Sequence, residues 1–230
     1  PAFELRGDWR DLSWPLAGEP RIRSPAGQFD VNGSAEVYSV NLDTSLVVPG
    51  QADGQLSLRA EGGISDGKAD AEIEMLKVSG TLRQRPLEVL VQGGLHNAQL
   101  RLDTLSAQSG DTRIGATGSV GDSMDLKWRI DSPDLGHLVP GARGSLSGEG
   151  SVAGSASLPA VRGSLQGNDI AYDGYRLERL ALDLNIDPDP NAASSHLDFA
   201  LDQVLLAGTE IRQVRVTGAG NRGDHQLGLY

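Results

Sequence analysis

The stretch GSLQGNDIAYDGYRLERLALDLNIDPDP, residues 163–190, decides the fold class of this chain. Its second half alternates apolar and polar residues almost without interruption. A period of two places alternate side chains on the same face of a β-strand. One face of this segment therefore carries Leu180, Leu182, Leu184 and Ile186. The segment predicts a strand with one apolar face, yet it contains no pattern that is typical of a catalytic motif.

The same alternation recurs along the chain and predicts an all-β protein. Further alternating segments occupy residues 55–60, 86–91, 99–105, 125–131, 196–202 and 211–217. Pairs such as Asp53-Gly54 and Asp173-Gly174 are typical of hairpin turns, because glycine adopts positive φ at low cost. Residues 177–184 and 197–205 also fit a helical stripe, but their length and flanking turns favour strands. We therefore predict a meander of antiparallel strands.

Only one short helix is expected, over residues 132–139. Ser132 is suited to cap it, Pro133 suits its first position, and Pro140-Gly141 would end it. At most one or two helical turns are predicted in the whole chain. We predict a single continuous segment over residues 1–230, with the only subdivision expected near residues 132–141.

A short phrase repeats along the chain. The sequences VSGTL, ARGSL and VRGSL, at residues 78–82, 142–146 and 161–165, each place a glycine and a small polar residue before a leucine. Repetition of one unit is typical of arrays whose units contact mainly their neighbours. The phrases therefore indicate an array that grows strand by strand, rather than one globular core.

The composition excludes several classes of partner and site. The 230 residues carry a formal net charge of −11, 30 glycines and no cysteine. Because lysine and arginine are scattered singly, no nucleic-acid partner is expected. No apolar run approaches the about 20 residues that a membrane-spanning helix needs. The chain begins at Pro1 and ends at Tyr230 within an alternating pattern, so we expect it to be an internal fragment of a longer protein.

A search for chemistry finds no convincing motif. The histidines His96, His137, His196 and His225 have no second ligand at the spacing of a metal site. Residues 148–154, GEGSVAG, approach a dinucleotide fingerprint, but the last gap is one residue too long and no helical pattern follows. Residues 187–190, DPDP, favour a loop. We therefore predict no catalytic residue, no metal and no cofactor, and we expect that the chain is not an enzyme.

The apolar strand faces remain the feature to explain, and the residues leave two interpretations open. In one, the faces pack together as the core of a closed β-sandwich or barrel, such as a secreted adhesin. In the other, an open, curled sheet keeps its inner face available for an apolar ligand. The tryptophans Trp9, Trp14 and Trp128 are expected to pack in the core or along the groove. Periodicity alone does not separate the two interpretations.

Several motifs, taken in order, carry a resemblance to a known family. They are LSWPL at 12–16, GQF at 27–29, DLGHLVP at 134–140, LPAVRGSL at 158–165, NDI at 168–170, GTEI at 208–211 and GDHQL at 223–227. In this order they resemble the TamB family, the subunits of translocation and assembly modules within the AsmA-like group of repeating β-groove proteins. The resemblance covers nearly the whole chain.

The resemblance implies an elongated, curled antiparallel sheet with an apolar interior, a β-taco. It also implies a location in the periplasm of a Gram-negative bacterium, within a protein anchored in the inner membrane by an N-terminal helix that this chain lacks. The groove would carry the acyl chains of phospholipids between the two membranes. The residues implied as its lining are Leu56, Leu58, Val89, Val91, Leu100, Leu102, Leu126, Trp128, Ile130, Leu180, Leu182, Leu184, Ile186, Leu197, Phe199, Leu201, Val214 and Val216.

The resemblance further implies protein partners. The family supports outer-membrane protein assembly with the outer-membrane partner TamA, through a region expected outside this chain. An alternative function is a scaffold that templates nascent outer-membrane β-barrel or autotransporter strands by pairing with its sheet edges.

Overall fold

The computed structural model describes residues 2–15, 19, 21–34, 36–65, 68–189, 195–206, 208–221 and 224–230. Its contacts group into two compact units, Pro1–Gly110 and Asp111–Tyr230, called unit 1 and unit 2 here. The segment 132–141, where a subdivision was expected, lies inside unit 2. The single continuous segment stays a prediction.

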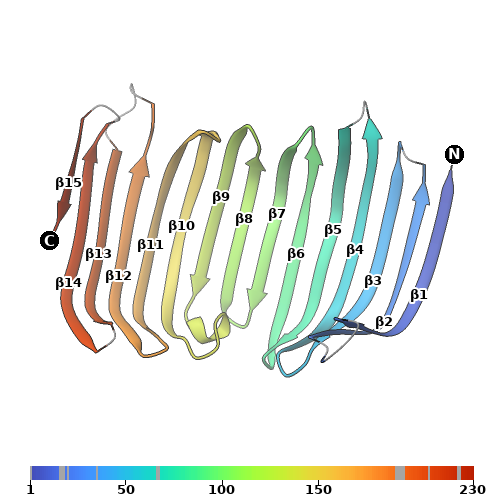
Figure 1. Cartoon of the computed structure of the whole chain (residues 1–230), viewed down its shortest axis with the longest axis horizontal. Helices are drawn as coiled ribbons and strands as arrows, with labels where there is room; N and C mark the ends of the chain where they lie inside the picture. The colour runs from blue at the N-terminus through green and yellow to red at the C-terminus, as the bar shows by residue number, and fades with distance from the viewer. Residues whose placement is uncertain are drawn as a thin grey trace. The chain divides into compact units, whose positions relative to one another are not determined.

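Unit 1 is an antiparallel sheet whose strands follow one another in sequence order (Figure 1). Each strand is long, and each pairs with its neighbours in the chain through short connections. The strands are β1 (Phe3–Trp14), β2 (Ile22–Gly33), β3 (Tyr38–Val48), β4 (Ala52–Ser65), β5 (Lys68–Leu82), β6 (Arg85–His96) and β7 (Gln99–Ser109).

Unit 2 repeats this plan. Its strands are β8 (Thr112–Val120), β9 (Ser123–Ser132), β10 (Arg143–Ser155), β11 (Leu158–Tyr172), β12 (Tyr175–Ile186), β13 (Ser195–Leu206), β14 (Thr209–Gly220) and β15 (His225–Leu229). All pairs are antiparallel between sequence neighbours, and the sheet does not close on itself. The predicted fold class, all-β with an open antiparallel sheet, is confirmed.

Most local predictions hold. Every alternating segment lies in a strand, including the two that also fitted a helical stripe. Asp173 and Gly174 form the predicted turn, with φ of 47° and 82°. The turn predicted at Asp53-Gly54 is wrong, because both residues lie inside β4 and pair with β5. The chain turns instead just before β4, at Gly50, which has φ of 71°.

The short helix is a single 3-10 turn, η1 (Leu135–His137). Its cap is Asp134, whose carboxylate accepts a hydrogen bond from the Gly136 amide at 2.9 Å. The prediction that Ser132 caps it is wrong. Ser132 ends β9, and its hydroxyl is buried against that of Thr112 at 2.9 Å. A serine at the end of an alternating strand fits a ladder position as well as a cap, so the sequence pattern did not separate the two.

No apolar side chain of the described residues is buried, so a sealed hydrophobic core is absent from that part of the chain. The interpretation as a closed sandwich core is therefore wrong for these residues. The fully buried side chains are hydroxylic, Thr112 and Ser132. Cross-strand pairs and backbone ladders, at about 0.2–1 kcal/mol for each side-chain pair, must therefore stabilise the sheets.

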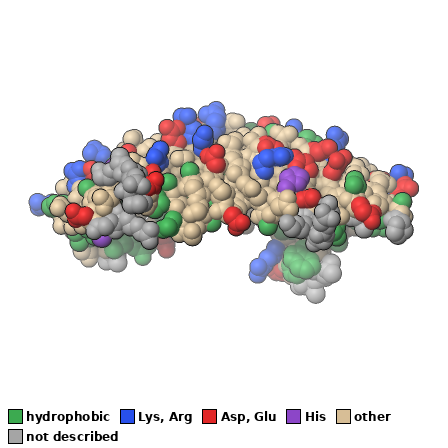
Figure 2. Space-filling view, turned by 90° about the horizontal axis from the view of Figure 1, so that it is seen from above, with side chains coloured by type: hydrophobic (Ala, Val, Ile, Leu, Met, Phe, Trp, Pro, Cys, Tyr) green, Lys and Arg blue, Asp and Glu red, His purple; other side chains and the backbone are tan. Residues whose placement is uncertain are grey.

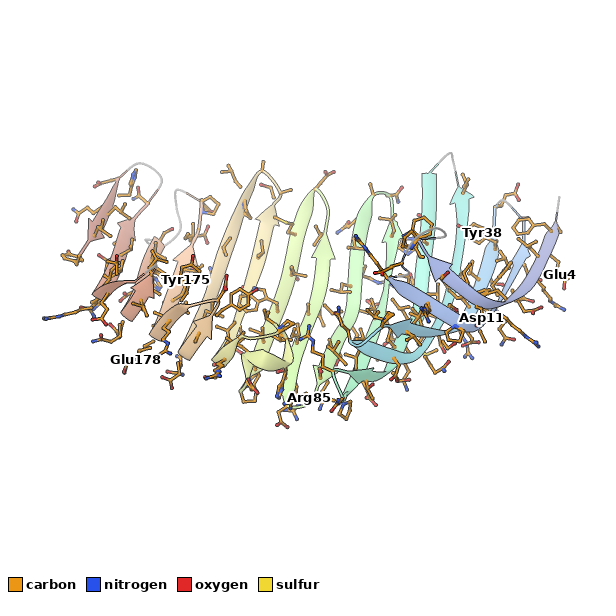
Figure 3. All side chains as sticks on the ribbon, turned by 60° about the horizontal axis from the view of Figure 1, so that its bottom comes forward. Glu4, Asp11, Tyr38, Arg85, Tyr175 and Glu178 are labelled. Carbon is orange, nitrogen blue, oxygen red and sulfur yellow. The ribbon has the colours of Figure 1, made fainter. Side chains whose placement is uncertain are left out.

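Strands in both units bend where a residue adopts the left-handed conformation. Asp11 in β1, Asp169 in β11 and Gln203 in β13 have φ of 54°, 51° and 52°. The ladders skip a residue pair at each of these positions, which changes the strand direction. Figure 1 shows that several strands curve near one of their ends, and Figure 3 labels Asp11 on the curved part of β1.

Candidate functional site

The register of unit 2 gathers the predicted lining residues of that unit on one face. Cross-strand partners in an antiparallel ladder point to the same side of the sheet. Two central rows cross unit 2, Ala116–Trp128–Gly150–Gly163–Leu184–Leu197–Gly218–Leu227 and Ile114–Ile130–Gly148–Leu165–Leu182–Phe199–Val216–Leu229. Flanking rows add Leu126–Val152–Val161–Ile186 and Gly167–Leu180–Leu201–Val214. We call this surface the apolar face of unit 2.

Unit 1 carries an equivalent apolar face. Its rows are Leu42–Leu58–Leu76–Val91–Leu105, Thr44–Leu56–Val78–Val89–Ala107, Val40–Ala60–Ile73–Gly93–Leu102 and Tyr38–Gly62–Ala71–Leu95–Leu100. The predicted residues Leu56, Leu58, Val89, Val91, Leu100 and Leu102 all belong to it. Register across distant strands therefore agrees with the period-two pattern read within each strand.

The predicted lining residues are partly open to solvent. Leu100 and Ile186 are exposed at 48% and 44%, and the other predicted residues are half-buried. A half-buried leucine in a single sheet is covered only by its neighbours on the same face. The apolar faces can therefore take up further apolar material, although contact of these residues with lipid stays a prediction.

The opposite face is charged. In unit 2 this face carries ion pairs between neighbouring strands, such as Arg215–Asp198 at 2.6 Å and Arg179–Asp202 at 3.4 Å. A hydrogen bond from the guanidinium to Asp198, together with the charge of that carboxylate, raises the pKa of Arg215. Figure 2 shows Lys and Arg side chains interspersed with Asp and Glu on the surface in view. Exposed pairs contribute about 0–1 kcal/mol each, so this face provides solubility more than stability.

Aromatic side chains on the apolar faces lie over glycines of the adjacent strand. A Cβ at Gly150 would lie 2.8 Å from Cε2 and Cζ2 of Trp128, and one at Gly62 would lie 2.8 Å from the Tyr38 hydroxyl oxygen. Both are directly paired positions. The pairs Trp9–Gly27 and Phe29–Gly7 follow the same rule. Sequence reasoning missed these pairs, because they depend on register between strands.

Two further glycines allow close backbone approach. A Cβ at Gly54 would lie 2.6 Å from the Ser79 carbonyl oxygen, and the partner position on β5 is Gly80. Neither glycine is among the residues with positive φ. This explains why Asp53-Gly54 carries a turn-like signature inside a strand: the glycine is needed for space, not for φ.

A cavity of about 430 Å³ opens at one end of β11–β15. Its apolar lining includes Leu158, Ile186, Pro188, Leu197 and Leu227. Another cavity, of about 500 Å³, borders Ala153, Arg162 and Asp187, so volume alone does not identify a site. The first cavity shares Ile186, Leu197 and Leu227 with the apolar face of unit 2.

The histidines do not form a cluster. His137 is buried and contacts Asp134 at 3.1 Å, His196 contacts Asp183 at 2.5 Å, and His96 lies 3.3 Å from Glu72. Within the described residues, no group of three or more His, Cys, Asp or Glu side chains is placed to hold a metal ion. Those residues also contain no helix long and apolar enough to cross a membrane.

Together these features define a class: open antiparallel β-sheet proteins with one charged face and one apolar face that remains partly exposed. A family model described as "TamB, N-terminal domain" matches residues 48–230, most of the chain. The chain therefore belongs to the TamB family, which is linked to the translocation and assembly module. Membership of this family implies that the protein is periplasmic. No solved structure matches the chain significantly.

Proposed function

We propose that this chain is a segment of a hydrophobic groove that carries phospholipids between the inner and outer membranes of a Gram-negative bacterium. The observation that carries the proposal is the apolar face of unit 2, where leucines align in rows across β12 and β13 without becoming buried. The segment acts without catalysis, within a protein anchored in the inner membrane, and supports outer-membrane protein assembly with TamA.

Apolar burial alone supplies enough free energy for this role. An acyl chain of about fifteen methylenes gains roughly 12 kcal/mol on leaving water, at about 0.8 kcal/mol for each methylene. No specific pocket is required, so apolar exchanges among lining residues are tolerated. A charged residue in a row of the apolar face is not expected to be tolerated, because a passing acyl chain would remove water from the charge at a high cost in free energy.

The direct test places a charge on each face of the same strand. Leu184→Arg introduces an ion into a central row, whereas Ala181→Arg lies on the opposite face, where its partners are Gln166 and Ala200. We expect Leu184→Arg to lower the phospholipid bound to the purified chain at least tenfold and Ala181→Arg to leave it unchanged, as measured by native mass spectrometry. Far-UV circular dichroism checks that both variants keep their strands. Undiminished lipid in a folded Leu184→Arg variant would refute the proposal.

Photocrosslinking in the full-length protein separates lipid from protein cargo. A crosslinker at Leu182, on the apolar face, should give phospholipid adducts, and one at Ala181 should not. If Leu182 instead captured strands of nascent outer-membrane proteins and no lipid, the scaffold function would replace the groove function.

A further inference from the structure

We propose that the indole N–H of Trp128 is a specificity-determining hydrogen-bond donor, which binds the ester carbonyl of a diacyl lipid lying on the apolar face of unit 2. This inference rests on the proposed lipid-carrying function and names the chemical group that the face recognises.

Trp128 is fixed at a central position of that face. It pairs with Gly150, and a Cβ there would lie 2.8 Å from two atoms of its six-membered ring. One strand further on, a Cβ at Gly163 would lie 3.6 Å from Cζ2 of the same ring. Two neighbouring glycines thus leave space that the indole fills, so the ring lies along the sheet rather than standing away from it.

The donor is isolated in its surroundings. In the two central rows, every other side chain is aliphatic, phenyl or absent, so the Trp128 N–H is the only side-chain donor there. It forms no hydrogen bond to any residue that the structure describes. The side chain is half-buried, and its nitrogen is not among the fully enclosed polar atoms that lack a partner, so the N–H keeps some contact with solvent.

An isolated donor on an apolar face discriminates among apolar ligands. A purely hydrocarbon ligand that covers the N–H removes its water and leaves it unpaired, which opposes binding. A diacyl lipid carries ester carbonyls beside its chains, and these accept a hydrogen bond without interrupting the apolar contact. A net hydrogen bond of ordinary strength corresponds to about fivefold in affinity.

The test compares two lipids that differ only in this acceptor. The purified chain is mixed with equal amounts of a diacyl phosphatidylcholine and the dialkyl ether analogue of the same chain length, and native mass spectrometry gives the ratio of the two bound lipids. We expect an ester-to-ether ratio of about 5 for the wild type and about 1 for Trp128→Phe. Replacement of Trp128 by benzothienylalanine, which keeps the bicyclic shape without N–H, should also give about 1.

Each outcome decides between alternatives. Equal binding of the two lipids by the wild type, or an ester preference that survives both replacements, would overturn the assignment to Trp128. Binding of neither lipid by the wild type would overturn the proposed function, and this inference with it. Trp9→Phe is the matched control: the Trp9 N–H is already bonded to Ser24, so this variant should keep the ester preference.

Discussion

Trp9 in unit 1 and Trp128 in unit 2 occupy equivalent positions with different polar surroundings. Each lies on an apolar face over a glycine of the next strand, Gly27 or Gly150. The Trp9 indole donates to the Ser24 hydroxyl at 2.7 Å, whereas the Trp128 indole has no partner among the described residues. The two rings pack in the same way, but the indole N–H is hydrogen-bonded within the protein in unit 1 and has no partner among the described residues in unit 2.

A local irregularity accounts for the difference. The β1–β2 ladder, which joins Trp9 to its partner strand, skips Asp11 just before the pair Leu12–Ser24. The β2–β3 register also shifts between Arg23 and Gly27, and the Ser24 hydroxyl lies 2.7 Å from that of Thr44. Both residues are buried, at 6% and 7% exposure. The β9–β10 ladder runs without a shift past Trp128, so no hydroxyl is brought beside its indole. Regular pairing keeps the central rows apolar.

The largest effect on stability is expected from replacing the glycine that lies below each indole ring. Gly27→Val and Gly150→Val force the indole from its place, and each should destabilise its own unit by about 2–3 kcal/mol through overpacking. Hydrogen-exchange mass spectrometry on the full chain should report faster exchange in β1–β3 for the first variant and in β9–β11 for the second.

Gly218→Ala is the matched control for these variants. Gly218 also lies in a central row, but a Cβ there would meet Leu197 at 3.4 Å, an ordinary contact. Its exchange should stay close to that of the wild type. If Gly150→Val exchanged as slowly as Gly218→Ala, the indole would not depend on the glycine for its place.

An intermediate effect is expected for Trp9→Phe. This variant loses ring area and also the hydrogen bond to Ser24, so we expect unit 1 to lose about 2 kcal/mol, half of it from the bond. Combining it with Ser24→Ala should add less than the sum of the two single changes, because both remove the same bond. Strict additivity in thermal unfolding would show that the bond contributes nothing.

The sequence predicted features that depend on a single strand, such as which side chains share a face. It missed features that depend on how two strands pair. Leu180, Leu182 and Leu184 could be assigned to one face because the period of two is a property of the strand itself. Gly54 was misread as a turn, because glycine serves both positive φ and close approach, and only pairing with Gly80 distinguishes them. The Trp128–Gly150 pair was missed for the same reason. Whether an apolar face is covered is likewise a property of the whole sheet.

The smallest expected effect is that of Trp128→Phe on stability. Like Trp9→Phe, it replaces an indole by a smaller phenyl ring, but it breaks no hydrogen bond within the described residues. We therefore expect a loss of about 1 kcal/mol or less, with the difference between the two variants giving the contribution of one hydrogen bond. Thermal unfolding without lipid provides the measurement, because any ligand would add its own stabilisation. If the two variants lost equal stability, the Trp128 N–H would be as engaged within the protein as that of Trp9, and it would not be free for an ester carbonyl.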